Sequence, residues 1–279
     1  MFRNTAKTAV LLAGLGGLMV AIGSLFGPTG AVIGLVLAMG FVGFSYWRSD
    51  SLAIRAAAAV PADEQQFPQY FAIMRKLSAK ADIPMPKLFV SPELQPNAFA
   101  TGRNPRHAAV AMTIALTKIG SWEQIRGVLA QELAHVRNRD IFIGSVAAAV
   151  ATAIPLFASL AMWGAMFGGG RDEERSNPIA LLATAILAPI AAALIQMAIS
   201  RNREFEADRT GADLIGSGAP LARALEKLDA YFKQVPMRVA PAQASHFIVN
   251  PLPGRQVIAN LFRHTTTDVC VARLRADHG

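Results

Sequence analysis

Cysteine and charge are both scarce in this chain. Its 279 residues include a single cysteine, Cys270, which excludes an intramolecular disulfide. A cysteine-based zinc or iron–sulfur centre built from this chain alone is excluded for the same reason. Charged residues make up only 16% of the chain, against about a quarter in typical soluble domains, while hydrophobic residues reach 53%. This composition argues against a wholly soluble protein and against intrinsic disorder.

The apolar residues are concentrated in stretches without Asp, Glu, Lys or Arg, at residues 8–47, 141–170 and 176–200. A membrane-spanning helix needs about 20 mostly apolar residues. The first stretch is too long for one span and contains the turn signal Gly27-Pro28-Thr29-Gly30. The sequence therefore predicts four transmembrane helices, at about 8–26, 29–47, 141–167 and 178–200. A cleaved signal peptide is the alternative for residues 1–26, and a buried core hairpin is the alternative for residues 141–200.

Basic residues orient these predicted spans, in a chain of net charge +8. They flank the spans on one side, at Arg3, Lys7, Arg48, Arg55, Arg137, Arg139, Arg201 and Arg203. That side is expected to be cytoplasmic, because lysine and arginine favour the inner face of a membrane. The chain then divides into an N-terminal hairpin (1–47), a second hairpin (141–200) and one cytoplasmic domain built from residues 48–140 and 201–279. We expect the lipid bilayer as a partner and no nucleic acid, since no basic patch is interleaved with aromatic residues.

Apolar spacing predicts a small mixed domain in the polar part of the chain. A helix is expected over residues 68–81, and short strands at 87–90, 97–102 and 107–116. Ser121 and Gln124 form a capping box for a further helix over about residues 122–140, for which a direct continuation into the third span is left open. The predicted fold class is mainly α with a small β-sheet, joined to four transmembrane helices.

The helix over residues 122–140 carries the sequence Gln131-Glu132-Leu133-Ala134-His135, one letter from His-Glu-x-x-His. In that motif two histidines one turn apart reach a single zinc ion, and the glutamate activates the attacking water. After the last predicted span, Glu204 and Asp208 share one face of a probable helix. Glu204 is a candidate metal ligand, and Asp208 a candidate brace for a histidine. Taken alone, each feature also describes an ordinary polar helix face.

Taken together, the motifs resemble the HtpX-type integral-membrane zinc metalloproteases of bacteria, distant relatives of the CAAX prenyl proteases. The resemblance covers nearly the whole chain and is carried by residues 45–50, 95–105, 107–110, 127–130, 138, 140, 203–208, 246–252 and 272–274. It implies one zinc ion per chain in a zincin-like cytoplasmic domain. It also implies an endopeptidase of the bacterial inner membrane, acting on misfolded membrane proteins in envelope or heat stress.

Position by position, the resemblance assigns roles to individual residues. Glu132 matches the catalytic base, and His135 and Glu204 match two zinc ligands. Gln131 stands where the first histidine ligand is expected, while Asn138 and Asp208 match residues around the ligands. The strand that contains Asn97, Ala98, Phe99 and Ala100, together with the strand at 107–116, resembles the edge along which an extended substrate lies.

Two departures from the family pattern leave alternatives open. A glutamine amide at position 131 is a weak, neutral ligand compared with imidazole. Rescue by another histidine is conceivable, with His107, His246 and His264 as candidates. The family's His-Pro-Pro-Thr-Glu-Glu-Arg is also lost, since residues 264–270 read His-Thr-Thr-Thr-Asp-Val-Cys. The first hypothesis is an active zinc endopeptidase, and the second is a pseudoprotease that binds unfolded membrane segments without efficient cleavage. A transporter is a distant third, because the spans lack ionisable residues.

Overall fold

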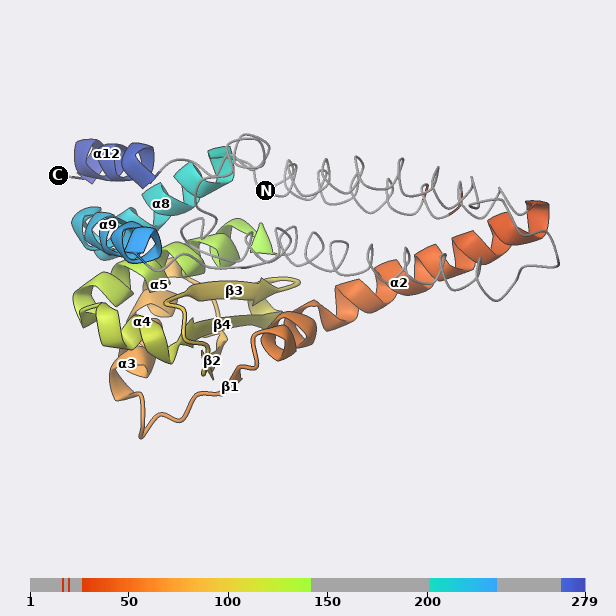
Figure 1. The fold of residues 1–279 in the computed structure, drawn as a ribbon, viewed down its shortest axis with the longest axis horizontal. Helices are drawn as coiled ribbons and strands as arrows, with labels where there is room; N and C mark the ends of the chain where they lie inside the picture. Colours follow the sequence, from red (N-terminus) through yellow and green to blue (C-terminus); the bar gives the residue numbers. More distant parts are fainter. Residues whose placement is uncertain (1–16, 18–19, 21–26, 142–200, 235–266, 279) are drawn as a thin grey trace.

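The computed structural model describes residues 17, 20, 27–141, 201–234 and 267–278, and the structural statements below refer to these residues (Figure 1). The elements with printed bounds are α2 (Gly27–Ala56), β1 (Val60–Pro61), α3 (Pro68–Ala81), β2 (Lys87–Ser91), β3 (Ala98–Gly102), the 3-10 turn Pro105–His107, β4 (Ala108–Thr113), α4 (Ile114–Ile119), α5 (Trp122–Asn138), α8 (Arg201–Ile215), α9 (Ala219–Gln234) and α12 (Thr267–His278). This is the mainly helical fold with a small sheet that the sequence predicts.

The described strands form one mixed sheet in the order β1-β2-β4-β3. β4 pairs in parallel with β2 and antiparallel with β3, where Ala98 lies opposite Met112 and Gly102 opposite Ala108. All six residues of β4 are buried, as expected for a strand covered on both faces. β3 is an edge strand of the described sheet. The predicted strand at 107–116 is therefore interior, and of the two strands expected to bind substrate only β3 lies at an edge of the described sheet.

The two faces of the sheet pack against different helices. Val110 and Met112 of β4 belong to the main core together with residues of α3 and α5. The alternate residues Ala109 and Ala111 pack with Ile54, near the C-terminal end of α2. From there α2 extends away from the sheet, whereas α5, α8, α9 and α12 gather beside it (Figure 1). The sheet thus lies between the C-terminal end of α2 and a group of helices that includes α5 and α8, which carry the motif residues.

The helix α5 begins as predicted, with both hydrogen bonds of the Ser121–Gln124 capping box present. Its direct continuation into a third span, which the sequence leaves open, does not occur. Arg139 adopts a left-handed conformation with φ of 57°, and its N–H donates to the carbonyl groups of the last helical turn. This ends α5 at Asn138, because a left-handed residue closes off the helix and turns the chain.

The predicted strand over residues 107–116 is too long at both ends. His107 belongs to the preceding 3-10 turn, and Ile114 begins the short helix α4. The hydroxyl of Thr113 accepts a hydrogen bond from the Leu116 N–H at 3.2 Å, which makes Thr113 the N-cap of α4. A threonine favours a strand by propensity, but here its side chain satisfies the first free donor of a helix instead.

Two glycines allow α5 to lie very close to its neighbours. A Cβ added at Gly127 would lie 2.5 Å from the Leu221 backbone nitrogen in α9. A Cβ added at Gly211 in α8 would lie 2.9 Å from the backbone nitrogen of Gln131. No side chain fits at either contact without moving a backbone. α5 is thereby fixed between α8 and α9, with its motif residues against α8.

The predicted span at 29–47 lies within α2, which begins two residues earlier and runs nine residues further. The glycine–proline sequence read as a turn forms the first turn of this helix, where proline is tolerated. Several of its large apolar side chains are exposed, including Val32, Met39 and Trp47 at 61%, 60% and 64%. Among the described helices, none combines the length and the apolar character needed to cross a bilayer. The predicted spans at 8–26, 141–167 and 178–200 fall outside the described residues, apart from residues 17, 20 and 141.

Candidate active site

Glu132 lies on α5 facing the edge strand of the sheet. The N–H of Ala100 in β3 donates a hydrogen bond to Glu132 Oε2 at 2.9 Å. The carboxylate is buried, with 8% of the residue exposed. Burial, together with the nearby Glu204 carboxylate, raises the pKa of Glu132 to about 7, although His135 and the Ala100 N–H oppose this shift. A carboxyl group with such a pKa can accept and release a proton near neutral pH.

His135, one turn further along α5, lies between two carboxylates. Its Nδ1 donates to Asp140 Oδ1 at 3.0 Å, and its Nε2 lies 3.6 Å from Glu204 Oε2. Burial lowers the pKa of His135, but the charges of Asp140 and Glu204 outweigh burial and raise it well above its usual range. The Asp140 contact fixes the ring orientation, so that Nε2 faces α8. Such a carboxylate partner is typical of histidines that bind a metal.

Gln131 pairs with the other acidic residue of α8. Its Nε2 donates to Asp208 Oδ1 at 2.7 Å, and both residues are buried. Gln131 Oε1 is also buried and has no hydrogen-bond partner among the described residues. Burial raises the pKa of Asp208 to about 7, opposed by a hydrogen bond from the Cys270 thiol of α12. Asp208 therefore braces position 131, while Asp140 braces the histidine.

The two helices pair their polar residues in opposite sequence order. Gln131 and His135 are one turn apart on α5, and Glu204 and Asp208 are one turn apart on α8. Gln131 meets Asp208, and His135 meets Glu204. The sequence correctly predicts that each pair shares a helix face. The contact between the two faces depends on tertiary packing, which the spacing alone does not contain.

The donor set can be tested against a zinc ion, the metal that the motif implies. No group of three or more His, Cys, Asp or Glu arranged for a metal occurs in the described part of the chain. His135 Nε2 and Glu204 Oε2 are nevertheless 3.6 Å apart, close to the roughly 3.4 Å between two ligands of one tetrahedral zinc. The third group at hand is the unpartnered amide oxygen of Gln131. The residues present fit a metal held by one imidazole, one carboxylate and one amide oxygen.

The remaining predicted residues lie around this centre or apart from it. Asn97 and Ala98 are buried at the start of β3, where the Asn97 N–H donates to Thr113 Oγ1, and Phe99 is half-buried on the opposite face from Ala100. Asn138 is half-buried in the last turn of α5. The rescue candidate His107 is exposed and hydrogen-bonded to Asn104. His246 and His264 fall outside the described residues.

Comparisons with known proteins decide the family. Residues 64–263 match the sequence pattern of peptidase family M48. The chain belongs to this family. It is 48% identical to a protein named protease HtpX homolog from Burkholderia thailandensis, over 278 residues that cover 97% of this chain and 96% of that protein. Homologs of the same name from Burkholderia mallei and Burkholderia pseudomallei show the same identity and coverage.

A solved structure supports the fold of this M48 peptidase independently of close sequence similarity. The crystal structure of S. mikatae Ste24p aligns with a TM-score of 0.54 at 19% identity, covering 98% of this chain and 66% of that chain. The resemblance to HtpX-type metalloproteases is thus confirmed. The chain is a zinc metalloprotease of the HtpX type, and hence a metalloendopeptidase by family.

Two residues near His135, Asp140 and Arg203, have no role of their own assigned from the sequence. Asp140 belongs to the family pattern, and Arg203 belongs both to that pattern and to the basic residues that flank the predicted spans. Asp140 is 4% exposed and holds His135. Arg203 is largely buried next to Asp140 and Glu204; burial lowers the pKa of its guanidinium, and the two carboxylates oppose this. Its position immediately before the candidate ligand Glu204 is the sequence signal that could have placed Arg203 near the site.

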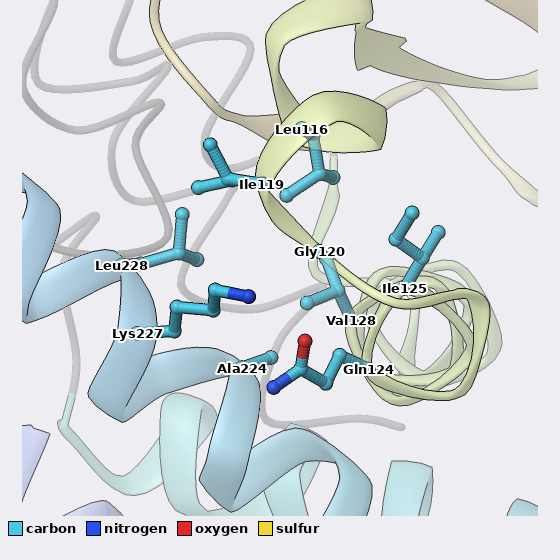
Figure 2. A pocket seen from close by; sticks show the side chains of 9 residues that line it. All are labelled: Leu116, Ile119, Gly120, Gln124, Ile125, Val128, Ala224, Lys227 and Leu228. Carbon is cyan, nitrogen blue, oxygen red and sulfur yellow. The ribbon is translucent and has the colours of Figure 1, made fainter.

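A separate pocket lies nearer the N-terminal end of α5 than Gln131, Glu132 and His135. Figure 2 shows it between α4, α5 and α9, with Leu116, Ile125 and Leu228 among its apolar lining residues. Its polar side chains are those of Gln124 and Lys227. It contains no carboxylate and no histidine, so it lacks the groups needed for hydrolysis.

Proposed function

We propose that this M48 peptidase is embedded in the bacterial inner membrane and cleaves misfolded membrane proteins with a cytoplasmic site. Glu132 acts as the general base in this proposal, and His135 and Glu204 bind the metal, with Gln131 at the position of the third ligand. Asp208 and Asn138 support these groups from the surrounding shell. The observation that carries the proposal is the approach of His135 Nε2 to Glu204 Oε2, with Glu132 on the same face of α5.

The metal, when bound, would polarise the scissile carbonyl and lower the pKa of a bound water. Glu132 is suited to accept the proton of that water, since its pKa of about 7 lets it exchange protons near neutral pH. The Ala100 N–H holds the Glu132 carboxylate toward the edge strand, where the substrate is expected. Asp140 keeps the His135 ring oriented through Nδ1, so that Nε2 is the nitrogen available at the centre.

An extended substrate would lie along β3, residues 98–102. This strand is one of the two edge strands of the described sheet, and its Ala100 N–H donates to Glu132. Pairing of a substrate backbone with an edge strand recognises extended conformation more than side-chain identity. That mode of binding is suited to unfolded segments, because folded proteins do not offer a free strand.

Placement in the membrane is supported by the exposed apolar side chains of α2 and by the uncharged stretches of the sequence. Val32, Ile33, Val36 and Met39 are all more than half exposed. A soluble protein rarely leaves so many large apolar side chains on one segment in contact with water. Extraction tests the point: the chain should stay in the membrane fraction at high pH and leave it only in detergent.

The decisive experiment measures metal and cleavage in the same detergent-purified full chain. We expect about one zinc ion per chain, and cleavage of an unfolded protein substrate such as labelled casein. Glu132→Gln is expected to keep the zinc and abolish cleavage, while Glu204→Ala loses both. Equal cleavage by the original chain and Glu132→Gln would refute the assigned base. Zinc without any cleavage would support the pseudoprotease alternative, which no contact described above favours.

A further inference from the structure

The amide of Gln131 has one end occupied and one end open. Nε2 donates to Asp208 Oδ1 at 2.7 Å. An ionised carboxylate can only accept, so ionised Asp208 fixes the amide with its nitrogen, and not its oxygen, facing the carboxylate. Oε1 points away from Asp208 and, within the described residues, accepts no hydrogen bond.

An unpaired buried acceptor is unfavourable. Only 6% of Gln131 is exposed, so water reaches the side chain poorly. A buried polar atom that loses water without gaining a partner costs about 1–3 kcal/mol. Because such atoms are rare in native proteins, the open oxygen indicates a partner that the described residues do not supply. The acidic residues nearby, Glu132, Asp208 and Glu204, favour a cation.

The neighbouring helix holds Gln131 in place. Gly211 of α8 lies against the backbone of Gln131, where a Cβ would come within 2.9 Å of its nitrogen. The same helix carries Glu204 to His135 and Asp208 to Gln131. The glutamine is therefore a fixed member of the constellation that contains His135 and Glu204, one helical turn from the histidine.

We infer that Gln131 is the third protein ligand of the metal through Oε1, and that Asp208 is the positioning residue that aims it. This inference rests on the proposed metal site and assigns its third ligand. An amide gives the two contacts that an imidazole would give, a donor to the carboxylate and a lone pair to the cation. The centre then has two oxygen donors and one nitrogen donor.

This donor set changes which cations the centre holds. A carbonyl-type oxygen is a harder and weaker ligand than imidazole, so zinc binds less tightly than in a site with a second histidine. Exchanging imidazole for amide oxygen also narrows the advantage of zinc over Mn²⁺, an ion that prefers oxygen ligands. The metal site therefore stays complete but releases zinc more readily.

Metal affinity of the full chain in detergent tests the inference without any substrate. Metal-free protein is titrated with Zn²⁺, Mn²⁺ and Co²⁺ against a chelator, and the visible spectrum of bound Co²⁺ reports the ligand set. Gln131→Leu keeps the size of the side chain but removes the oxygen, and should weaken zinc at least about tenfold. Gln131→His should tighten zinc by a similar factor, with little gain for Mn²⁺. Each of the two variants should also change the Co²⁺ spectrum.

Asp208→Asn tests the positioning role. It should weaken zinc binding about tenfold in the original chain, yet add little in the Gln131→Leu background, because Asp208 acts on the metal through Gln131. Gln65→Leu, at an exposed glutamine, is the matched control and should bind zinc unchanged. Gln131→Asn retracts the oxygen by one methylene while keeping the amide. It should weaken zinc as well, which covers the case in which Gln131→Leu fails to fold.

The outcomes separate this inference from the proposed function. If Gln131→Leu and Gln131→Asn bind zinc as the original chain does while Glu204→Ala does not, the metal site stands and Gln131 is not a ligand. If the original chain binds no metal at any concentration tested, both the inference and the proposed metal site are wrong. An unchanged Co²⁺ spectrum in Gln131→His would also overturn the ligand assignment.

Discussion

The two helices that flank α5 meet it in opposite ways. On the α9 side, Gly127 lies against Leu221, and the surrounding side chains, such as Val128 and Leu225, are apolar and buried. On the α8 side, Gly211 lies against Gln131, and the polar pair Gln131 and Asp208 is buried there, next to the buried Glu132 of α5. Both contacts need a glycine, but only the first consists of groups that favour burial.

The difference separates the contact that stabilises the domain from the contact that holds the residues proposed to perform chemistry. Burial of apolar side chains at α9 lowers the free energy of the folded state. Burial of carboxyl groups at α8 opposes folding unless they are protonated or paired, which is why the pKa values of Glu132 and Asp208 rise to about 7. A helix pair arranged only for stability would place apolar residues there.

The largest expected effect comes from adding one methyl group at either glycine. Gly127→Ala and Gly211→Ala each force a backbone contact under 3.0 Å, and both should lower the free energy of unfolding by about 1–3 kcal/mol or more. Only Gly211→Ala should also weaken zinc binding, because it moves α8 with Glu204 away from His135. Thermal unfolding and zinc titration of both variants measure the two effects. Equal zinc affinities of the two variants would contradict the proposed difference between the α8 and α9 contacts.

The second effect concerns the brace of the histidine. Asp140→Asn keeps the shape of the side chain but removes the charge that orients and polarises His135. Loss of such a partner is expected to weaken zinc binding about 10–100-fold while leaving the helical content unchanged. Isothermal titration and circular dichroism check the two statements. Arg75→Ala, which removes the exposed ion pair with Glu64, is the control and should change neither.

The third effect is a pH dependence of the metal-free protein. Glu132 and Asp208 have folded-state pKa values of about 7, raised above their ordinary values of 4.5 and 3.8, and His135 is raised above 6.5. Each raised pKa means that the folded state binds protons more tightly, so stability is lost as pH rises through the folded-state pKa. The melting temperature without metal should fall between about pH 5 and pH 8. Saturating zinc should reverse the trend, and a metal-free melting temperature that rises over this range contradicts the burial argument.

The smallest expected change in stability belongs to the edge strand. Ala100→Pro removes the N–H that donates to Glu132, at an edge where proline is tolerated. The free energy of unfolding should fall by no more than about 1–3 kcal/mol, the cost of leaving one buried acceptor without its donor. Cleavage should fall, because Glu132 loses the donor that holds its carboxylate at the edge strand. Unchanged cleavage by this variant would contradict this role of the Ala100 N–H.

Local features of the sequence predict local features of the structure well. The helix over 68–81 has the predicted bounds, and the Ser121–Gln124 capping box forms as expected. The shared helix face of Gln131 and His135 also follows directly from their spacing. In these cases the decisive interactions lie within a few residues of one another, so that propensity and periodicity carry enough information.

What the sequence misses depends on contacts between distant segments or on single backbone angles. The left-handed Arg139 ends α5 where apolar residues continue, and this turn brings Asp140 back to His135. Thr113 caps α4 instead of extending β4. Asp208 was expected to brace a histidine and instead braces Gln131, because the packing of α8 on α5 decides which carboxylate meets which partner.

Gly211 has one more consequence, for the alignment of the two helices along their length. Sliding α8 by one turn, about 5.4 Å, would bring Ala207 or Ile215 to the place where only a glycine fits. The slide that brings in Ala207 would leave Glu204 facing Gln131. The slide that brings in Ile215 would set Asp208 beside His135. The absence of a side chain at residue 211 thus fixes the register of α8 on α5. In that register the imidazole of His135 meets the carboxylate of Glu204.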